Sequence, residues 1–362
     1  MNLVRRSVLK HPSGLEIKTP LLIPSFSSKG CVFPKAIPKS KECKYTFFRT
    51  ETILAKDKNP NSGKISEVTV YLNNALRTLT DSMLVSAYDI FHKHIPLPYE
   101  NTTPEIIFLD SGGYEVGDTF DYSTIIRSTV IANEWKNEHY IEVLEAWPDD
   151  VPAVFISFDY HGESVDKQIE LAKKLFSRFR GRQLCAVLIK PVSAEYTFRR
   201  TLDGIRENIT QLKDFDILGI ADKDMGNSLF MVMENIAKIR LALDEAKVNI
   251  PLHIFGSLDP LTSWLYYLSG AELFDGLSWL RYGYFEGRTV YYRNYGILSL
   301  GSEKHDDIIR LESTIHNLYY LMDIQLEMAQ FASDHDYNKI KFNGNFLRVE
   351  YEALCKKIEK EI

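Results

Sequence analysis

The sequence predicts an α/β chain folded as a (β/α)8 TIM-type barrel, and two observations predict it. From about residue 83 onward, short runs rich in β-branched and aromatic residues alternate with amphipathic stretches, the pattern of parallel strands joined by helices. With one N-terminal run the strand candidates number eight, and eight strand–helix units in roughly 260 residues match this barrel in number and length. A doubly wound open sheet is the alternative architecture.

The predicted strands are short and mostly apolar, and stretches with apolar residues three and four positions apart separate them. We predict crossover helices at Glu163–Arg178, Thr197–Leu212 and Gly226–Ala246. The eight predicted strands are Leu21–Phe26, Met83–Ile90, Ile106–Asp110, Ala153–Asp159, Leu184–Lys190, Asp216–Ala221, Leu252–Gly256 and Leu273–Leu277.

Two segments depart from this alternation. Pro34–Thr80 is rich in Lys, Pro and Asn, which predicts an N-terminal β insertion at about residues 30–80, made of a hairpin and an exposed loop. After the last strand, Tyr282–Tyr295 is tyrosine-rich and predicted to be β, and charged helices follow near His305–Ser333 and Asn345–Lys360. We therefore expect a catalytic barrel domain, residues 1–300, followed by a C-terminal helical extension, residues 301–362.

The composition, 45% hydrophobic and 25% charged, is that of an ordinary globular protein. No run approaches about 18 apolar residues and the N-terminal stretch lacks an apolar secretion signal, so we expect a cytoplasmic protein with no membrane partner. Cys31, Cys43, Cys185 and Cys355 show no CxxC spacing, which predicts reduced thiols. The net charge of −6 leaves nucleic-acid binding open, because such binding needs only a local basic patch.

Carboxylates gather where the predicted strands end. Asp110 closes the third strand and is followed by Ser111, Gly112 and Gly113, whose small side chains let the backbone approach a ligand closely. Asp159 closes the fourth strand, Asp222 follows the sixth, and Asp275 lies within the eighth. Because the strand ends of such a barrel converge on one face, several of these carboxylates are expected to share a cleft. The alternative for any one of them is a cap on the next helix.

Two carboxylates around one site suit acid/base or covalent chemistry at an electron-poor carbon. The most natural such carbon is an anomeric one, attacked by one carboxylate while the other manages the proton of the leaving group. The residue pattern therefore predicts a glycosyl-transferring or glycosyl-hydrolysing barrel, and it leaves the sugar open.

Several motifs resemble the tRNA-guanine transglycosylase family. Phe108–Val116 (FLDSGGYEV) resembles that family's DSGGFQV signature, and Gly270–Asp275 (GAELFD) resembles the run that carries its nucleophile. The resemblance spans residues 19 to about 322. Further matches, in the family's order, are Thr19–Pro24, Ser86–Asp89, Ser157–Asp159, Arg281 and Ile315–Tyr320.

The resemblance implies separate roles for the carboxylates. Asp275 would be the nucleophile that attacks C1′ of a guanosine or deoxyguanosine, and Asp110 the acid/base partner. Asp159 would read the N1–H and 2-amino group of the base. Tyr114 would stack on that base or simply pack its loop, and Lys190 and Arg281 would hold phosphates or be solvated surface. The complete expected substrate-binding set is Ser111, Gly112, Gly113, Tyr114, Asp159, Lys190, Gly219, Asp222 and Arg281.

The chain departs from the family at the zinc site and in two loops. The family's zinc needs a CxCxxC segment before the histidine that matches His316, but no cysteine lies between Cys185 and Cys355. We therefore expect no metal and no other cofactor, and His316 as a buried, hydrogen-bonded residue. Leu188–Pro191 replaces the family's VQGG segment, and Gly219–Gly226 replaces its GGLAVGE-like loop.

Such divergence around retained aspartates resembles the DpdA-like branch, which inserts 7-deazaguanines into DNA. The expected partners are therefore DNA more than tRNA, a 7-deazaguanine base such as preQ0, and accessory modification proteins. The alternatives are an enzyme that acts on tRNA, a non-catalytic nucleic-acid-binding subunit of such an enzyme, and an unrelated barrel glycosidase.

Overall fold

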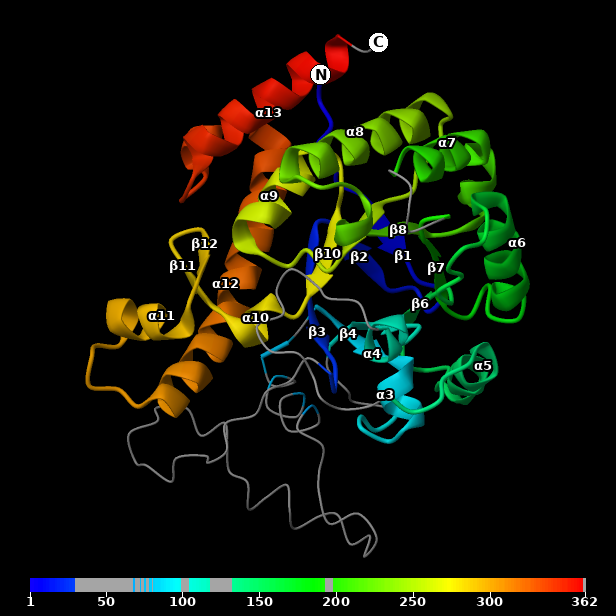
Figure 1. Ribbon diagram of the computed structural model, residues 1–362, viewed down its shortest axis with the longest axis horizontal. Helices are drawn as coiled ribbons and strands as arrows, with labels where there is room; N and C mark the ends of the chain where they lie inside the picture. Colours follow the sequence, from blue (N-terminus) through cyan, green and yellow to red (C-terminus); the bar gives the residue numbers. More distant parts are fainter. Residues whose placement is uncertain are drawn as a thin grey trace, which may run out of the picture.

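The computed structural model describes residues 1–29, 81–98, 104–117, 132–192 and 198–360, together with Val68, Leu72, Ala75, Thr78 and Leu79. Eight strands, all parallel to their neighbours, close into a barrel with helices around it (Figure 1). They follow the order of the sequence around the barrel, and the last pairs with the first. The predicted (β/α)8 barrel is confirmed, and the open sheet is excluded. The strands are β3 (Leu21–Phe26), β4 (Ser82–Ser86), β5 (Ile106–Asp110), β6 (Ala153–Ile156), β7 (Leu184–Ile189), β8 (Ile217–Ala221), β9 (Leu252–Phe255) and β10 (Leu273–Gly276).

The helices between the strands cover the outside of the barrel. Amphipathic segments form them, as the spacing of their apolar residues predicts. The three predicted crossover helices are confirmed with shorter bounds, and the second of them ends in a 3₁₀ turn. The described helical segments up to the last strand are α3 (Ala87–Phe91), α4 (Gly113–Val116), α5 (Asn137–Ala146), α6 (Val165–Phe176), α7 (Arg199–Glu207), η2 (Ile209–Asp214), η3 (Asp222–Asp224), α8 (Leu229–Glu245) and α9 (Pro260–Leu268).

One strand prediction is wrong over half its length. The expected strand Met83–Ile90 ends at Ser86, and the chain continues directly into α3. Ser86 pairs with Asp110, which is the last residue of β5, so no neighbouring strand remains to extend the ladder of hydrogen bonds. The predicted strand Ala153–Asp159 also stops early, at Ile156, and Asp159 lies in the loop that follows.

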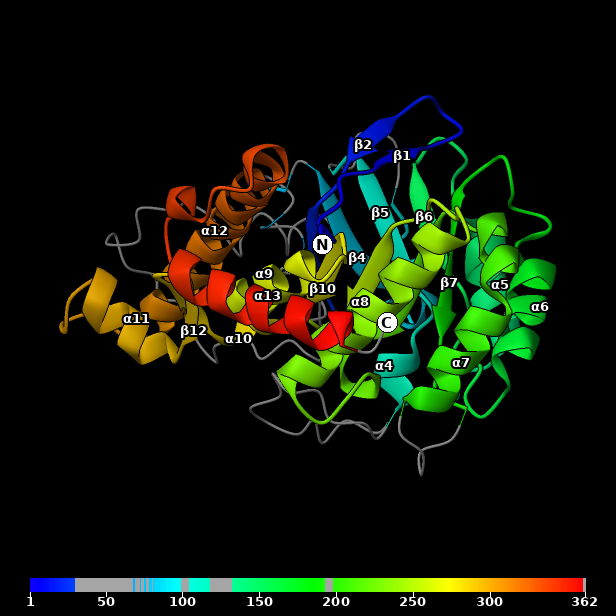
Figure 2. The same ribbon diagram turned by 90° about the horizontal axis from the view of Figure 1, so that it is seen from above.

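An N-terminal hairpin that the sequence analysis missed closes one end of the barrel. β1 (Val8–Lys10) and β2 (Glu16–Lys18) pair antiparallel, and Leu9 and Ile17 join the apolar cluster inside the barrel. Buried His11, just after β1, shares a hydrogen bond of 2.8 Å with Gln183, the residue before β7. The hairpin therefore covers the N-terminal ends of the strands, and the C-terminal ends lie at the opposite end of the barrel (Figure 2).

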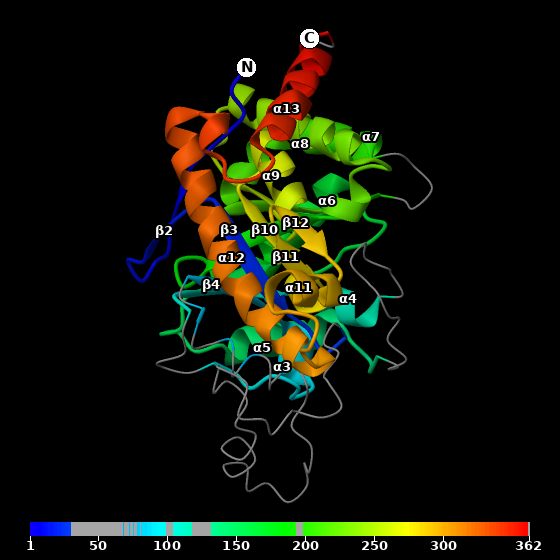
Figure 3. The same ribbon diagram turned by 90° about the vertical axis from the view of Figure 1, so that its left-hand side faces the viewer.

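The C-terminal segment packs on the barrel. α12 (Asp306–Asp334) lies along β3, where Gln325 accepts a hydrogen bond of 2.9 Å from the Leu22 amide (Figure 3). Apolar residues of α12 and α13 (Gly344–Glu359) belong to the same hydrophobic core as the barrel helices. Both predicted C-terminal helices are confirmed. The elements that precede and link them are α10 (Ser278–Arg281), β11 (Gly283–Phe285), β12 (Arg288–Val290), α11 (Tyr292–Ser299) and η4 (Tyr337–Lys339).

Two further predictions hold only in part. The β prediction for Tyr282–Tyr295 is right for the hairpin β11–β12, but the chain is helical from Tyr292. Most of the predicted insertion lies outside the described residues. At Val68, Leu72 and Ala75 the backbone is helical and the side chains are buried, so the hairpin prediction is wrong at these positions.

Cys185 and Cys355 are free thiols, as predicted, whereas Cys31 and Cys43 lie outside the described residues. Burial raises the pKa of the Cys185 thiol to about 12, which keeps this thiol protonated and unreactive. No helix within the described residues combines the length and the apolar character that crossing a membrane requires.

Candidate active site

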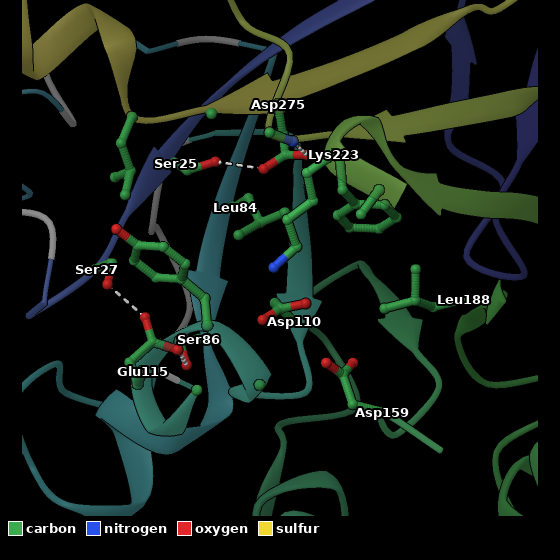
Figure 4. A pocket seen from close by; sticks show the side chains of 18 of the residues that line it. Ser25, Ser27, Leu84, Ser86, Asp110, Glu115, Asp159, Leu188, Lys223 and Asp275 are labelled. Atoms are coloured by element: carbon green, nitrogen blue, oxygen red, sulfur yellow. Dashed lines mark hydrogen bonds between the residues drawn. The ribbon is translucent and has the colours of Figure 1, made fainter. Parts of the chain in front are cut away.

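A cavity of about 170 Å³ opens at the C-terminal ends of the barrel strands (Figure 4). One buried water needs only about 10–15 Å³, so this cavity has room for an organic ligand. Its wall brings together carboxylates from four different strand ends, as the sequence predicted. The predicted site residues that line it are Asp110, Gly113, Tyr114, Asp159, Lys190, Asp222 and Asp275, and those that do not are Ser111, Gly112, Gly219 and Arg281.

Asp275 points into the barrel from β10. Leu273 belongs to the cluster inside the barrel, and side chains of a strand alternate, so Asp275 two positions later faces the same way. Its side chain is buried and accepts three hydrogen bonds. Ser25 Oγ donates to Oδ2 at 2.8 Å, His253 Nε2 to Oδ1 at 3.0 Å and the Gly256 amide to Oδ1 at 3.3 Å. These three donors hold the Asp275 carboxylate in one orientation at the cavity wall.

His253 is a site residue that the sequence analysis missed. It lies on β9 next to Leu273 of β10, is fully buried, and stacks on Phe255 with ring centroids 3.8 Å apart. A signal was present in the sequence. His253 is the polar residue in the apolar run LHIF, and it alternates with Leu252 and Ile254, which face the surrounding helices. Side chains along a strand alternate between the inside and the outside of the barrel. A polar residue that faces the inside near the end of a strand is therefore a candidate for contact with the site.

Asp110, the last residue of β5, carries a strongly shifted pKa. Burial raises this pKa to about 8, and the neighbouring carboxylates of Asp159 and Glu115 add to the effect. The Gly112 amide donates a hydrogen bond of 3.1 Å to the Asp110 carboxylate and, with the charge of Lys190, lowers the pKa. These two effects are smaller than that of burial. Asp110 is therefore largely protonated at neutral pH and can donate a proton into the cavity.

Asp159 is held in the opposite state. Lys190 Nζ lies 3.1 Å from its Oδ2, Ser111 Oγ donates to its Oδ1 at 3.0 Å, and His161 Nε2 lies 3.5 Å from Oδ2. Burial alone would raise the pKa of Asp159, but Lys190 and His161 hold it well below its usual range. The same contact raises the pKa of Lys190 against its own burial. Lys190 therefore fixes an ionised carboxylate in the cavity wall.

The Ser111–Gly113 loop lies tightly against its neighbours, which explains its two glycines. Gly112 has a φ of +92°, in the left-handed region that favours glycine. A Cβ on Gly113 would lie 2.0 Å from Asp159 Oδ2. Trp135 Nε1 donates to the Ser111 carbonyl at 2.9 Å from behind the loop. Ser111 and Gly112 thus act on the cavity indirectly, by placing Asp159 and Asp110.

Glu115 is a second residue without a role in the sequence analysis. It is buried at the cavity wall, where Ser86 Oγ donates to its Oε2 at 2.7 Å and Ser27 Oγ donates to its Oε1 (Figure 4). Burial raises the pKa of Glu115 to about 7, with a further contribution from Asp89. Burial also raises the pKa of Asp89, to about 6. In the sequence, Glu115 lies within the DSGGYEV run, at the position where the DSGGFQV signature has glutamine.

The remaining predicted residues act at the rim or through neighbours. Burial raises the pKa of Asp222 to about 6, and Tyr266 donates to its Oδ1 at 2.7 Å. Gly219 makes room for Phe255, because a Cβ there would lie 2.5 Å from the Phe255 ring. Arg281 donates to the Tyr114 hydroxyl at 2.8 Å and so orients a ring that lines the cavity.

Among the described residues, His316 has no partners that would complete a zinc site. Its Nε2 donates to the Tyr284 carbonyl oxygen at 3.1 Å, which leaves Nδ1 as its nitrogen with a lone pair. In the described part of the chain, no group of three or more His, Cys, Asp or Glu side chains is placed to hold a metal ion. We expect metal analysis of the purified protein to find far less than one zinc per chain, and stoichiometric zinc would contradict this prediction.

The site thus contains an anchored carboxylate, a protonated carboxyl and an ionised carboxylate around one cavity. In other enzymes, neighbouring carboxyl groups with opposite protonation states divide the work, with the protonated one as the acid and the ionised one as the nucleophile. Neither the models of known protein families nor the sequences of curated proteins match this chain.

Proposed function

We propose that this chain is a transglycosylase that exchanges guanine in a polynucleotide for a 7-deazaguanine such as preQ0. The observation that supports this best is the pairing of Asp275 and Asp110 in one cavity. Asp275 is anchored by three donors, and burial raises the pKa of Asp110 to about 8. A buried nucleophile and a neutral acid on one cavity wall suit displacement of a base at an anomeric carbon.

The proposed reaction has two displacements at C1′. In the first, a carboxylate oxygen of Asp275 forms a bond to C1′ while the bond from C1′ to the guanine nitrogen breaks, and Asp110 gives its proton to the departing base. The sugar is then an ester of Asp275. In the second, the nitrogen of the incoming 7-deazaguanine attacks C1′, Asp110 takes its proton, and the Asp275 carboxylate is released. Two inversions retain the configuration at C1′.

Asp159 is proposed to select the base. Its oxygens accept from Ser111 and contact Lys190, and the exposed His161, 3.5 Å from Oδ2, is proposed to yield its contact to a bound base. A carboxylate with about four acceptor positions then has capacity for two more donors. The N1–H and 2-amino group of a guanine are such donors, whereas adenine has an acceptor at N1. Bound adenine would leave an acceptor of Asp159 buried and unpaired, and a site of this kind rejects such a base strongly. The ring of Tyr114, oriented by Arg281, is proposed to stack on the base.

A polynucleotide would present its base to this cavity by flipping it out of the stack, which costs a few kcal/mol. A second cavity of about 440 Å³ shares Asp222 and Gly256 with the first. This adjoining space is proposed to take the sugar–phosphate chain next to the flipped nucleotide. The departures from the tRNA enzymes at Leu188–Pro191 and Gly219–Gly226 favour DNA as that polynucleotide.

Radiolabelled 7-cyano-7-deazaguanine, offered with double-stranded DNA and separately with tRNA, tests the proposal. Wild-type protein, with accessory modification proteins supplied, is expected to incorporate label into DNA, and Asp275→Ala is expected to incorporate none. Label in tRNA alone would contradict the DNA assignment. Binding of nucleic acid without label in either would contradict catalysis and favour a non-catalytic subunit.

A further inference from the structure

The two oxygens of the Asp275 carboxylate have different environments. Oδ1 accepts two hydrogen bonds from groups fixed to the barrel, His253 Nε2 and the Gly256 amide. Within the described residues, Oδ2 accepts one, from the hydroxyl of Ser25. We propose that His253 is a positioning residue that, with the Gly256 amide, keeps Oδ1 as the carbonyl oxygen of the sugar ester and leaves Oδ2 to attack C1′. This inference rests on the proposed transglycosylase function.

The surroundings of His253 decide which of its nitrogens carries the hydrogen. A carboxylate only accepts, so the nitrogen facing Asp275 Oδ1, Nε2, must be the donor. The other nitrogen, Nδ1, is buried and has no hydrogen-bond partner among the described residues. A hydrogen on Nδ1 would therefore be an unsatisfied buried donor. The ring stacks on Phe255, with ring centroids 3.8 Å apart, and lies nearly perpendicular to the ring of Phe108, with centroids 5.7 Å apart.

This arrangement suits both displacements. When Oδ2 shares an electron pair with C1′, Oδ1 becomes a carbonyl oxygen that still accepts from His253 and Gly256. When the incoming base breaks the ester, the pair returns to the carboxylate, and the same fixed donors stabilise the charge that reappears. The Ser25 hydroxyl differs from them because it rotates freely and can release Oδ2 at the moment of attack. No oxidant, reductant or further reactant is needed.

The hydrogen on Nε2 can be tested without any catalytic activity. In protein with ¹⁵N-labelled histidine, the signals of residue 253 are identified by their loss in His253→Phe. We expect wild-type His253 to show the neutral form with hydrogen on Nε2, and Asp275→Ala, which removes the acceptor, to shift the Nε2 signal. A His253 ring that carries its hydrogen on Nδ1, or one unaffected by Asp275→Ala, would overturn the inference.

The consequence for the reaction is tested by the rate at which the incoming base breaks the covalent protein–nucleic acid ester, because that step returns charge to the Asp275 carboxylate. His253→Phe keeps a ring to stack on Phe255 but has no N–H, and we expect it to slow the breaking of the ester by the incoming base by about 10²–10³-fold, the usual loss for one donor fixed on developing charge. The KM for the free base should stay unchanged. In His253→Gln the amide nitrogen is as many bonds from Cα as the Nε2 of histidine, so its N–H can reach Asp275 Oδ1. This variant should recover part of the rate. Ser25→Ala is expected to cost less than about 10-fold, the loss of one modest hydrogen bond.

Thermal unfolding of each variant distinguishes these effects from loss of the fold. A larger loss for Ser25→Ala than for His253→Phe would overturn the assignment of Oδ2 as the attacking oxygen. A raised KM with an unchanged rate, or no recovery in His253→Gln, would overturn the positioning role. A folded wild type that forms no ester with DNA or tRNA would contradict the proposed function and the attacking-oxygen assignment together, while the ¹⁵N result would still decide whether His253 donates to Asp275.

Discussion

Asp275→Asn is expected to lower the rate of base exchange by at least about 10⁴-fold, because removal of a nucleophile costs up to about 10⁶ in comparable enzymes. The substitution keeps the size of the side chain but replaces an attacking oxygen by an amide nitrogen. The wild type, incubated with nucleic acid in the absence of an incoming base, should accumulate a protein–nucleic acid species that survives denaturing electrophoresis. Asp275→Asn should bind the same nucleic acid and form none.

Asp149→Asn is the matched control for this experiment. Asp149 is an exposed aspartate that pairs with Arg182 on the outside of the barrel, and an exposed ion pair of this kind contributes little. Its substitution should leave the covalent species intact. If Asp275→Asn still forms the species in amounts similar to the wild type, another residue is the nucleophile and the proposed mechanism is wrong.

Asp110→Asn is expected to slow exchange by about 10²–10⁴-fold, the usual contribution of a positioned general acid. The wild-type rate should also fall as the pH rises through about 8, because the protonated form of Asp110 is the reactive one and its pKa is raised to about 8. This alkaline fall should be absent in Asp110→Asn. N7-methylguanine leaves without being protonated. With an oligonucleotide that carries this base, Asp110→Asn should therefore slow the reaction far less than it does with guanine.

Protein stability offers a measurement of Asp110 that needs no activity. The pKa in the folded protein lies above the value of roughly 4 expected in the unfolded chain. Protonation therefore favours the folded state, and the stability that it contributes is lost as the pH rises from roughly 4 through about 8. Asp110→Asn, which stays neutral, should gain melting temperature relative to the wild type across this range. A difference that does not change with pH would contradict the raised pKa.

Strand identity could be predicted because the barrel strands are short apolar runs whose residues are buried on both faces. Leu21–Phe26 and Ile106–Asp110 have the same bounds in the sequence analysis and in the structure. The end of β4 could not be predicted in this way. MLVSAYDI reads as one apolar run, but Ser86 has a partner on β5 and Ala87 has none. Strand length is set by the neighbouring strand, which a single segment does not reveal.

The candidate site was predictable to a similar degree. Asp110, Asp159 and Asp275 could be found because they end or interrupt apolar strands, and the structure brings them to one cavity. The donors that anchor Asp275 come from elsewhere in the chain. Ser25 lies 250 positions away and His253 lies 22 positions away, and each reaches Asp275 because β3 and β9 flank β10.

The sequence by itself determined the barrel and the strand ends that carry carboxylates. Local patterns suffice for these features, because apolar periodicity acts within a few residues. Only the tertiary structure decided the protonation states. Asp110 ends β5 and Asp159 lies in the loop after β6, yet burial among carboxylates raises the pKa of the first aspartate and Lys190 lowers that of the second. That difference in pKa depends on which charged side chains share the cavity, and the closure of the eight strands into a barrel decides which side chains meet there.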